Sequence, residues 1–314
     1  MCVGIEASRG FNEAGLNSEL TSNAWPGRRW LRDAMTNLFA RLPLACKTWL
    51  YGRLLRPVLW TFFHLEKAPI VIVPAGPPDH RFKMKLLWQS HIVYALGIYE
   101  PEMIQFLQKQ IRPADYCIDA GAHLGYLTIL MALLVGEGGS ITSFEAVPEN
   151  FRVLEENVRI NDLQNVSLQN VALAEKTGTL SIAVTAYQEL SWTPSAVGYA
   201  VDKDQRTITV PAISLDDFLS NSGRKPAVIK IDVEGAELFV LRGASETLRR
   251  KRPVLFLEIH GWGTSSSQEV MSFLASLNYK VSIIGNRKEE AFCLALPKDV
   301  AAGIERESRG VSRA

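Results

Sequence analysis

The chain has 314 residues, of which 47% are hydrophobic and 21% are charged. The 34 basic and 33 acidic side chains give a formal net charge of +1. This balance argues against a general nucleic-acid binder, because attraction to phosphates needs a surplus of lysine and arginine. The 22 glycines and 15 prolines are an ordinary share, so the composition also excludes a disordered or collagen-like chain.

The cysteines and the apolar runs indicate a cytoplasmic protein. None of the four cysteines belongs to a C-x-x-C pair, which predicts neither a zinc site nor a disulfide framework, and isolated thiols are typical of a reducing compartment. Residues 1–10 lack the apolar core of a signal peptide. The run Leu127–Val135 is too short to cross a bilayer, for which about 20 residues are needed.

The first 65 residues are expected to fall into two parts. Residues 1–27 show no periodicity and are expected to form a disordered leader, whereas residues 28–65 read as a basic amphipathic helical segment. Between Arg28 and Arg56, seven basic residues and one acid give 7 − 1 = +6. Such a segment can make peripheral contact with an anionic membrane. The interpretation we favour is a helical hairpin that packs on the main domain or on a second subunit of a homo-oligomer.

Residues 66–296 are predicted to form the main domain. It begins with strands at 69–73 and 81–88 and with a helix after Tyr99-Glu100, because Pro101 suits the first helical position. Strands and helices then alternate, with strands at 116–120, 140–146, 166–172, 227–232 and 253–260, and helices at 126–134, 148–161, 215–219, 236–243 and 267–277. Antiparallel pairs are expected at 179–184 with 206–210 and at 280–284 with 291–295. The alternation predicts an α/β fold, a mostly parallel sheet with helices on both faces, followed by a flexible tail at 297–314.

The segment Asp119–Gly125 follows the expected strand 116–120 and opens a helix. Glycine lets the backbone approach a ligand closely, and the carboxyl end of the first strand is where doubly wound sheets bind ligands. The segment reads D-x-G-x-x-x-G, and His123 stands where a dinucleotide fingerprint has its second glycine against the pyrophosphate. We therefore expect a ligand without a diphosphate, whose amino group Asp119 receives directly or through water.

Glu145 ends the next expected strand, where an acid can accept both hydroxyls of a ribose. Combined with the glycine segment, it describes a pocket for S-adenosylmethionine, whereas the glycines alone would also fit a plain strand-to-helix turn. Asn170-Val171-Ala172 ends the third strand, where the edge of an adenine ring would lie. The predicted cofactor-binding residues are Glu100, Asp119, Gly121, His123, Gly125, Glu145, Asn170 and Ala172.

The expected strand at 227–232 carries an unusual set of charges. Lys230, Asp232 and Glu234 alternate along it and tend towards one face, although a strand covered on both faces should be nearly all apolar. A structural ion pair would explain the lysine, and a catalytic cluster is the explanation we prefer. Glu258 and His260 share a face at the end of the next strand, where a histidine beside an acid serves either packing or acid–base chemistry.

Together these motifs resemble the FkbM family of S-adenosylmethionine-dependent methyltransferases, and the resemblance spans Ile70 to Leu296. The motifs, in order, are Tyr99-Glu100-Pro101, Asp119–Gly125, Phe144-Glu145, Ser214–Asp217, Lys230–Gly235 and Glu258–His260. The resemblance implies a Rossmann-like class I methyltransferase fold with a seven-stranded sheet. It implies cofactor contacts at Asp119, Gly121 and Glu145, acceptor-side roles near Asp232 and His260, and O-methylation of sugars, polyketides or other secondary metabolites. The sequence departs from the family at His123, where asparagine is common, and at Ala146, where proline is usual.

The expected chemistry is an in-line displacement in which the protein mainly holds the acceptor oxygen on axis while a base removes its proton. His260 is the first candidate for this base because its unperturbed pKa lies near neutrality, Asp232 is the second, and Lys230 completes the predicted catalytic cluster. Alternatively, Asp232 and Glu258 hold a divalent metal, although the sequence shows no dedicated metal motif.

The expected acceptor is a small hydroxylated molecule such as a sugar, a glycolipid or a polyketide-like compound. Its predicted binding residues are Trp192, Glu234 and Glu258, with Trp192 as a stacking surface. Two other functions stay open at this point: a nucleotide-dependent oxidoreductase on a related fold, and a non-catalytic cofactor-binding scaffold.

Overall fold

The structure is a computed structural model, which describes residue 46 and residues 70–74, 81–86, 92–185, 191–192, 205–287 and 290–301. The chain divides into two compact units, 1–67 and 68–314, and almost all of the described residues belong to the second. The leader expected at 1–27 and, apart from residue 46, the basic segment expected at 28–65 lie outside the described residues. None of the described helices has the length and hydropathy needed to cross a bilayer.

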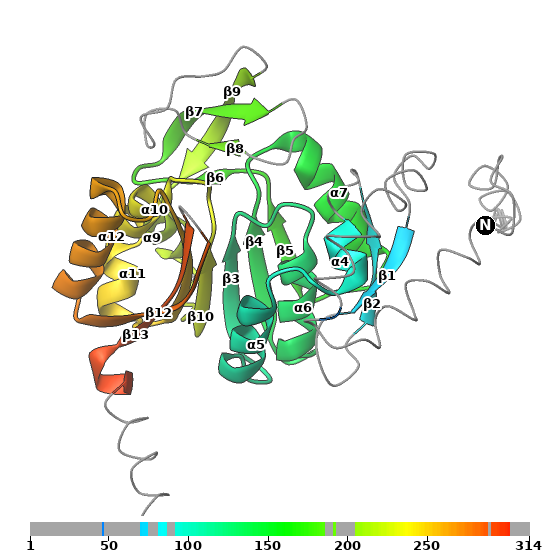
Figure 1. The fold of residues 1–314 in the computed structure, drawn as a ribbon, viewed down its shortest axis with the longest axis horizontal. Helices are drawn as coiled ribbons and strands as arrows, with labels where there is room; N and C mark the ends of the chain where they lie inside the picture. Colours follow the sequence, from blue (N-terminus) through cyan, green and yellow to red (C-terminus); the bar gives the residue numbers. More distant parts are fainter. Residues whose placement is uncertain are drawn as a thin grey trace, which may run out of the picture. The chain divides into compact units, whose positions relative to one another are not determined.

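A seven-stranded sheet forms the centre of the second unit, and helices cover both of its faces (Figure 1). Its strands run in the order β12-β13-β11-β10-β3-β4-β5. Five of them are parallel neighbours, and β13 runs antiparallel to both β11 and β12. The strands are β3 (Tyr116–Ala120), β4 (Ser140–Phe144), β5 (Val166–Gln169), β10 (Val228–Ile231), β11 (Val254–His260), β12 (Tyr279–Arg287) and β13 (Glu290–Pro297). The predicted α/β fold and its seven-stranded, mostly parallel sheet are confirmed.

Successive side chains of each strand point to opposite faces of the sheet, and helices pack on both faces. Ile229 and Ile231 of β10 point into the apolar core beneath the helices of the second half of the chain, whereas Lys230, between them, points to the face covered by α5 and α6. The helices are α4 (Ile92–Leu96), α5 (Pro101–Gln110), α6 (Tyr126–Val135), α7 (Pro148–Arg159), α9 (Leu215–Leu219), α10 (Glu237–Gly243), α11 (Ser245–Arg250) and α12 (Ser265–Ser276).

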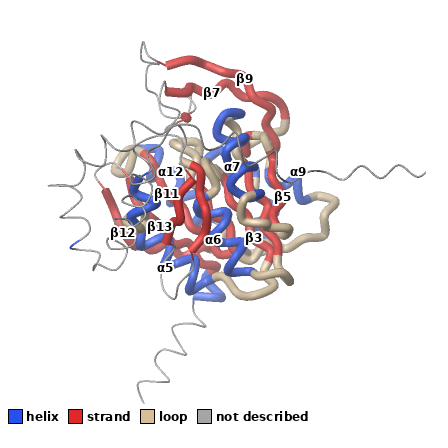
Figure 2. Tube along the Cα trace, turned by 90° about the vertical axis from the view of Figure 1, so that its right-hand side faces the viewer, coloured by secondary structure: helices blue, strands red, loops and turns tan. Residues whose placement is uncertain are grey.

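Smaller sheets flank the central one. β1 (Ile70–Pro74) and β2 (Arg81–Lys85) form an antiparallel pair. A second sheet, with the order β6-β9-β7-β8, lies at one end of the central sheet in both views (Figures 1 and 2). Its strands are β6 (Ala172–Leu173), β7 (Gly178–Thr185), β8 (Ser191–Trp192) and β9 (Gln205–Ile213).

Most expected elements are present, with several differences. The strand predicted at 166–172 is wrong beyond Gln169, because Ala172–Leu173 leaves the central sheet and pairs with β9. The helices α4 and α11 and the short strand β8 were not predicted. The prediction of a flexible tail from residue 297 is wrong for residues 297–301, because β13 includes Pro297 and a helical turn follows at 298–301, with Ala301 buried. Residues 302–314 lie outside the described residues.

Candidate functional site

The glycine segment forms a tight turn between β3 and α6, and it packs against the end of β10. Gly121 has a φ of +80°, and a Cβ atom on it would lie 1.8 Å from the carbonyl oxygen of Asp232. No residue with a side chain fits at that distance, so glycine is required here for close approach as well as for its backbone conformation. The amides of Gly121 and Ala122 donate to the carbonyl of Phe144, at 3.0 and 2.9 Å. The segment therefore links the ends of β3, β4 and β10.

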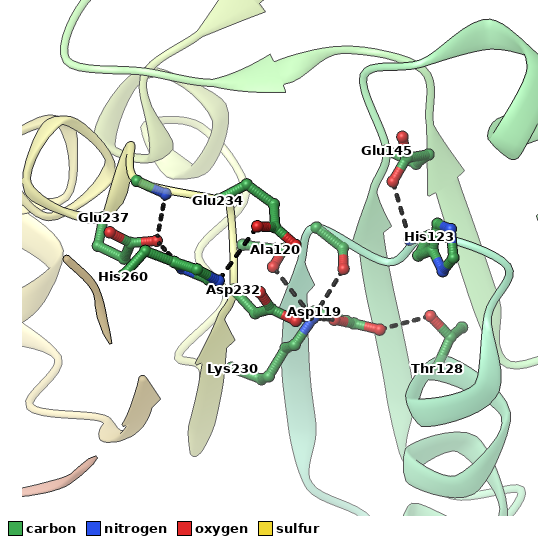
Figure 3. Close-up of polar contacts among 12 residues, drawn as sticks. Asp119, Ala120, His123, Thr128, Glu145, Lys230, Asp232, Glu234, Glu237 and His260 are labelled. Atoms are coloured by element: carbon green, nitrogen blue, oxygen red, sulfur yellow. Dashed lines mark hydrogen bonds and ion pairs between the residues drawn. The ribbon is translucent and has the colours of Figure 1, made fainter. Parts of the chain in front are cut away.

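Glu145 holds the same turn from the other side. Its buried carboxylate accepts a hydrogen bond from the backbone amide of His123, at 2.8 Å (Figure 3). It accepts a second one from the backbone amide of Val147, at 2.9 Å. Burial raises the pKa of Glu145 to about 7, although the two backbone hydrogen bonds oppose that shift. The residue expected to bind a ribose thus also positions the turn on which the cofactor would rest.

Lys230 joins the two halves of the site. It lies opposite Asp119 in the parallel register of β10 and β3, and its Nζ is 3.1 Å from Asp119 Oδ1. The same ammonium donates to the carbonyl of Gly121 at 2.7 Å and lies 3.5 Å from Asp232 Oδ2 (Figure 3). Burial alone would lower the pKa of Lys230, but Asp119 and Asp232 raise it well above its ordinary value. Lys230 is therefore a cation that positions its neighbours, and it has no lone pair with which to act as a base.

Both carboxylate oxygens of Asp119 contact other residues inside the protein. Its side chain is fully buried, and its second oxygen accepts a hydrogen bond of 2.6 Å from Thr128, the hydroxyl of which lies 3.0 Å from Ser143. Asp119 is not among the residues that line the cavity described below. Its structural task is to hold Lys230 and the start of α6, and its contact with a cofactor stays a prediction.

His260 lies between two carboxylates, and each of its ring nitrogens has an acidic partner. Nδ1 is 2.9 Å from Glu237 Oε1, and Nε2 is 3.1 Å from Glu234 Oε2 (Figure 3). Burial would lower the pKa of His260, but the hydrogen bond with Glu237 and the charge of Glu234 raise it to about 11. The imidazole is thus held in its protonated form. This arrangement is against the expected role of His260 as general base, because neither nitrogen is free to accept a proton.

Two further acids lie close to the histidine. Burial raises the pKa of Glu258 to about 10, and the neighbouring Asp232 and Glu100 add to that shift. Burial likewise raises the pKa of Glu234 to about 8, where the charge of His260 opposes the shift. Protons are therefore retained near neutral pH in a cluster that holds more carboxyl groups than cations.

These residues surround one cavity of about 310 Å³, which is within the range of small-molecule sites. Among the predicted site residues, ten line it: Glu100, Gly121, His123, Glu145, Ala172, Lys230, Asp232, Glu234, Glu258 and His260. Three others do not. Asp119 lies behind the wall, Gly125 begins α6, and Asn170 donates to the backbone carbonyl of Glu145 at 2.8 Å. The side chain of Trp192 lies outside the described residues, so its role stays a prediction.

The lining of the cavity fits S-adenosylmethionine better than a dinucleotide. Its described acids are Glu100, Glu145, Asp232, Glu234, Glu258 and Glu290, and its described basic residues are His123, Lys230 and His260. Two of these three, Lys230 and His260, are already paired with carboxylates. Neither of these two cations is available to a diphosphate, whereas the acid-rich described lining favours a sulfonium. Val171, Ala172 and Ile182 supply apolar surface of the kind on which a nucleobase packs.

The backbone at the cavity is strained at three positions that carry side chains. Glu100, His123 and Glu234 have φ values of 34°, 50° and 52°, a region that non-glycine residues seldom adopt. All three line the cavity. Such conformations persist only where the surroundings enforce them, and they gather at functional sites.

Sequence reasoning missed Glu237 and Thr128. Glu237 is buried in the first turn of α10, where its Oε1 also accepts from the amide of Gly235 at 2.8 Å. An acid three residues after Glu234 was the available signal for it. Thr128 lies on the predicted helix after the glycine turn, but nothing in the pattern shows that it faces Asp119.

The sheet order, with β13 inserted antiparallel, and the acid-lined cavity at the carboxyl ends of β3, β4, β10 and β11 define a class I methyltransferase domain of the S-adenosylmethionine-dependent type. The family model described as the methyltransferase FkbM domain matches residues 119–281, which is more than half of the chain. The chain belongs to this family.

Curated relatives are more distant. A protein-L-isoaspartate O-methyltransferase of Caenorhabditis elegans is 25% identical over 155 residues, which are 48% of this chain and 64% of that protein. The hexuronic acid methyltransferase AglP of Haloferax volcanii is 25% identical over 199 residues, or 62% of this chain and 76% of that protein. The chain thus spans less than two thirds of the first of these relatives. A solved FkbM methyltransferase of Methylobacillus flagellatus KT is 16% identical with a TM-score of 0.42, covering 66% of this chain and 53% of that one.

Proposed function

We propose that this domain transfers the methyl group of S-adenosylmethionine to a hydroxyl oxygen of a sugar or of a related small hydroxylated acceptor. The observation that carries the proposal is the single cavity in which the glycine turn and Glu145 meet Lys230, Asp232 and His260. When bound, the cofactor supplies an activated methyl group on a positively charged sulfur. The protein then has to bind, orient and remove one proton.

The cofactor half is assigned to β3 and β4. The turn at Gly121 and the carboxylate of Glu145 are proposed to hold the ribose, since Glu145 keeps acceptor capacity beyond its two backbone hydrogen bonds. Val171 and Ala172 are proposed to pack against the base. Lys230 acts as a positioning residue that keeps the glycine turn against β10.

Asp232 is the proposed base for the acceptor hydroxyl. Its side chain is 16% exposed, lines the cavity and is fixed by the ammonium of Lys230 at 3.5 Å. His260 is not the proposed base, because it is protonated between Glu234 and Glu237. Positioned proton transfer contributes about 10²–10⁴-fold to a rate.

The proposal of a sugar as acceptor is supported by one relative and by the polarity of the cavity. The relative from Haloferax volcanii is named as a hexuronic acid methyltransferase, and hydroxylated sugars are consistent with a polar cavity rich in hydrogen-bond acceptors. An oxidoreductase is less well supported, since two of the three described basic residues of the cavity are already paired with carboxylates.

The test is formation of S-adenosylhomocysteine by the purified full chain with a panel of free sugars, glycolipids and polyketide alcohols. Asp232→Asn is expected to bind S-adenosylmethionine normally and to lose at least about 10²-fold in turnover. Glu246→Gln, an exposed acid paired with arginines on α11, is the matched control and keeps full turnover. Unchanged turnover in Asp232→Asn would remove that residue from the mechanism.

We propose a cytoplasmic location. We also propose that any contact with an anionic membrane is made by residues 28–65. The test is sedimentation of the full chain with phosphatidylserine vesicles and, as control, with phosphatidylcholine vesicles. Pelleting with the anionic vesicles alone supports membrane contact. Equal recovery in both supernatants supports packing on the domain or on a second subunit.

A further inference from the structure

The acceptor side of the cavity contains more ligating atoms than proton transfer needs. Asp232, Glu234 and His260 each place one potential ligand atom within 4.8 Å of the other two. Glu258 and Glu290 form a second such group with the same histidine. These residues come from the ends of β10, β11 and β13 and from the turn before α10, so the sheet topology rather than one flexible loop brings them together.

The orientation of His260 suits a ligand. Its Nδ1 is fixed by Glu237, which is 2% exposed and is itself held by the amide of Gly235. A metal-binding histidine nearly always has its other ring nitrogen on a carboxylate or carbonyl, which sets the tautomer and the ring orientation. Nε2 is the atom left to face Glu234 and Asp232.

Glu258 provides an independent indication. It is 6% exposed, it lines the cavity, and its carboxyl group forms no hydrogen bond or ion pair with any of the described residues. Its carboxyl group therefore faces the cavity without a protein partner among the described residues, and it is available to ligate a cation bound there.

We propose that His260 Nε2, Asp232 and Glu234 bind a divalent cation of the Mn²⁺ type, with Glu258 as a further oxygen ligand. One imidazole with several carboxylates favours Mn²⁺ over a thiolate-seeking metal. The cation takes the place of the proton between Nε2 and Glu234, so no group is oxidised or reduced. Its use rests on the proposed function: the cation would lower the pKa of the acceptor hydroxyl, and the carboxylate oxygen of Asp232 that does not bind the cation would still accept the proton.

The experiment measures Mn²⁺ alone. The full chain, stripped with a chelator, is titrated with MnCl₂, and free Mn²⁺ is followed by electron paramagnetic resonance in the absence of cofactor and acceptor. One site per chain is expected. Asp232→Asn and Glu258→Gln should each weaken it at least about tenfold, and Glu237→Gln should weaken it about 10–100-fold through the orientation of His260. Glu246→Gln should leave it unchanged.

Mn²⁺ binding and methyl transfer are measured separately, so the metal site and the proposed function can fail independently. Binding that is absent, or that survives both Asp232→Asn and Glu258→Gln, overturns the metal site even if methyl transfer proceeds. Mn²⁺ binding that both variants weaken supports the site even if no acceptor in the panel is methylated. Circular dichroism of each variant checks that lost binding does not reflect unfolding.

Discussion

Replacing Lys230 with methionine is the most informative perturbation of the structure. The Lys230 side chain is 2% exposed, and its ammonium contacts Asp119, Asp232 and the carbonyl of Gly121. Its loss leaves the fully buried carboxylate of Asp119 with only Thr128 as partner. Breaking a buried ion pair by removing one partner costs about 3–5 kcal/mol. Because Asp119 and Lys230 are both almost inaccessible to water, screening by solvent does not reduce this figure.

The assay is urea unfolding of Lys230→Met, Asp119→Asn and the double variant, followed by circular dichroism. Lys230→Met alone is expected to lose about 3–5 kcal/mol. The double variant should be more stable than the sum of the single effects predicts, with a coupling of about 1–3 kcal/mol, because removing the charge of Asp119 removes the reason for the penalty. A loss below about 1 kcal/mol in Lys230→Met, or strict additivity, would refute the assignment of Lys230 as the buried counter-ion of Asp119.

Three further predictions concern the glycine turn, Glu145 and His260. Gly121→Ala should lower the free energy of unfolding by at least about 3 kcal/mol, because the new Cβ meets the carbonyl of Asp232. Gly136→Ala is the control, since Gly136 is also at positive φ but has no atom within 4 Å of a Cβ, and it should cost about 1–2 kcal/mol. Equal urea midpoints for the two variants would contradict this. The affinity for S-adenosylmethionine should rise about tenfold from pH 6 to 8 as Glu145 ionises with its pKa of about 7, and calorimetry should show a flat profile in Glu145→Gln. His260→Ala should keep cofactor affinity and lose turnover, and parental turnover in the variant would show that His260 is dispensable.

The sign of the Glu145 effect on folding is opposite to its effect on binding. Its pKa in the folded state lies above its ordinary value of 4.5, so it contributes stability below that value and loses it as the pH rises through about 7. Glu145→Gln should therefore gain in relative stability over this interval, which urea midpoints at several pH values measure.

The sequence was enough for the order of the elements and for the edge of the sheet at which the site lies. Alternation of strands and helices predicted the parallel sheet, and the charges at Lys230 and Asp232 indicated that β10 ends in a polar cluster. Both follow from periodicity and from the cost of burying charge.

The direction of individual side chains was beyond the sequence. Asp119 faces Lys230 instead of the cavity because the register of β3 against β10 places them opposite each other, and no local pattern gives that register. The protonated state of His260 depends on Glu237, which only the turn into α10 brings to its Nδ1. The sequence therefore predicted which residues lie at the end of a single strand, but it did not predict which side chains from different elements contact each other.

The most direct test of the central claim is calorimetric titration of the full chain with S-adenosylmethionine and, separately, with NADH. An acid-lined cavity with its lysine already paired predicts binding of S-adenosylmethionine at one site, loss of that binding in Gly121→Ala, and no heat from NADH. Saturable binding of NADH without any binding of S-adenosylmethionine would contradict the account.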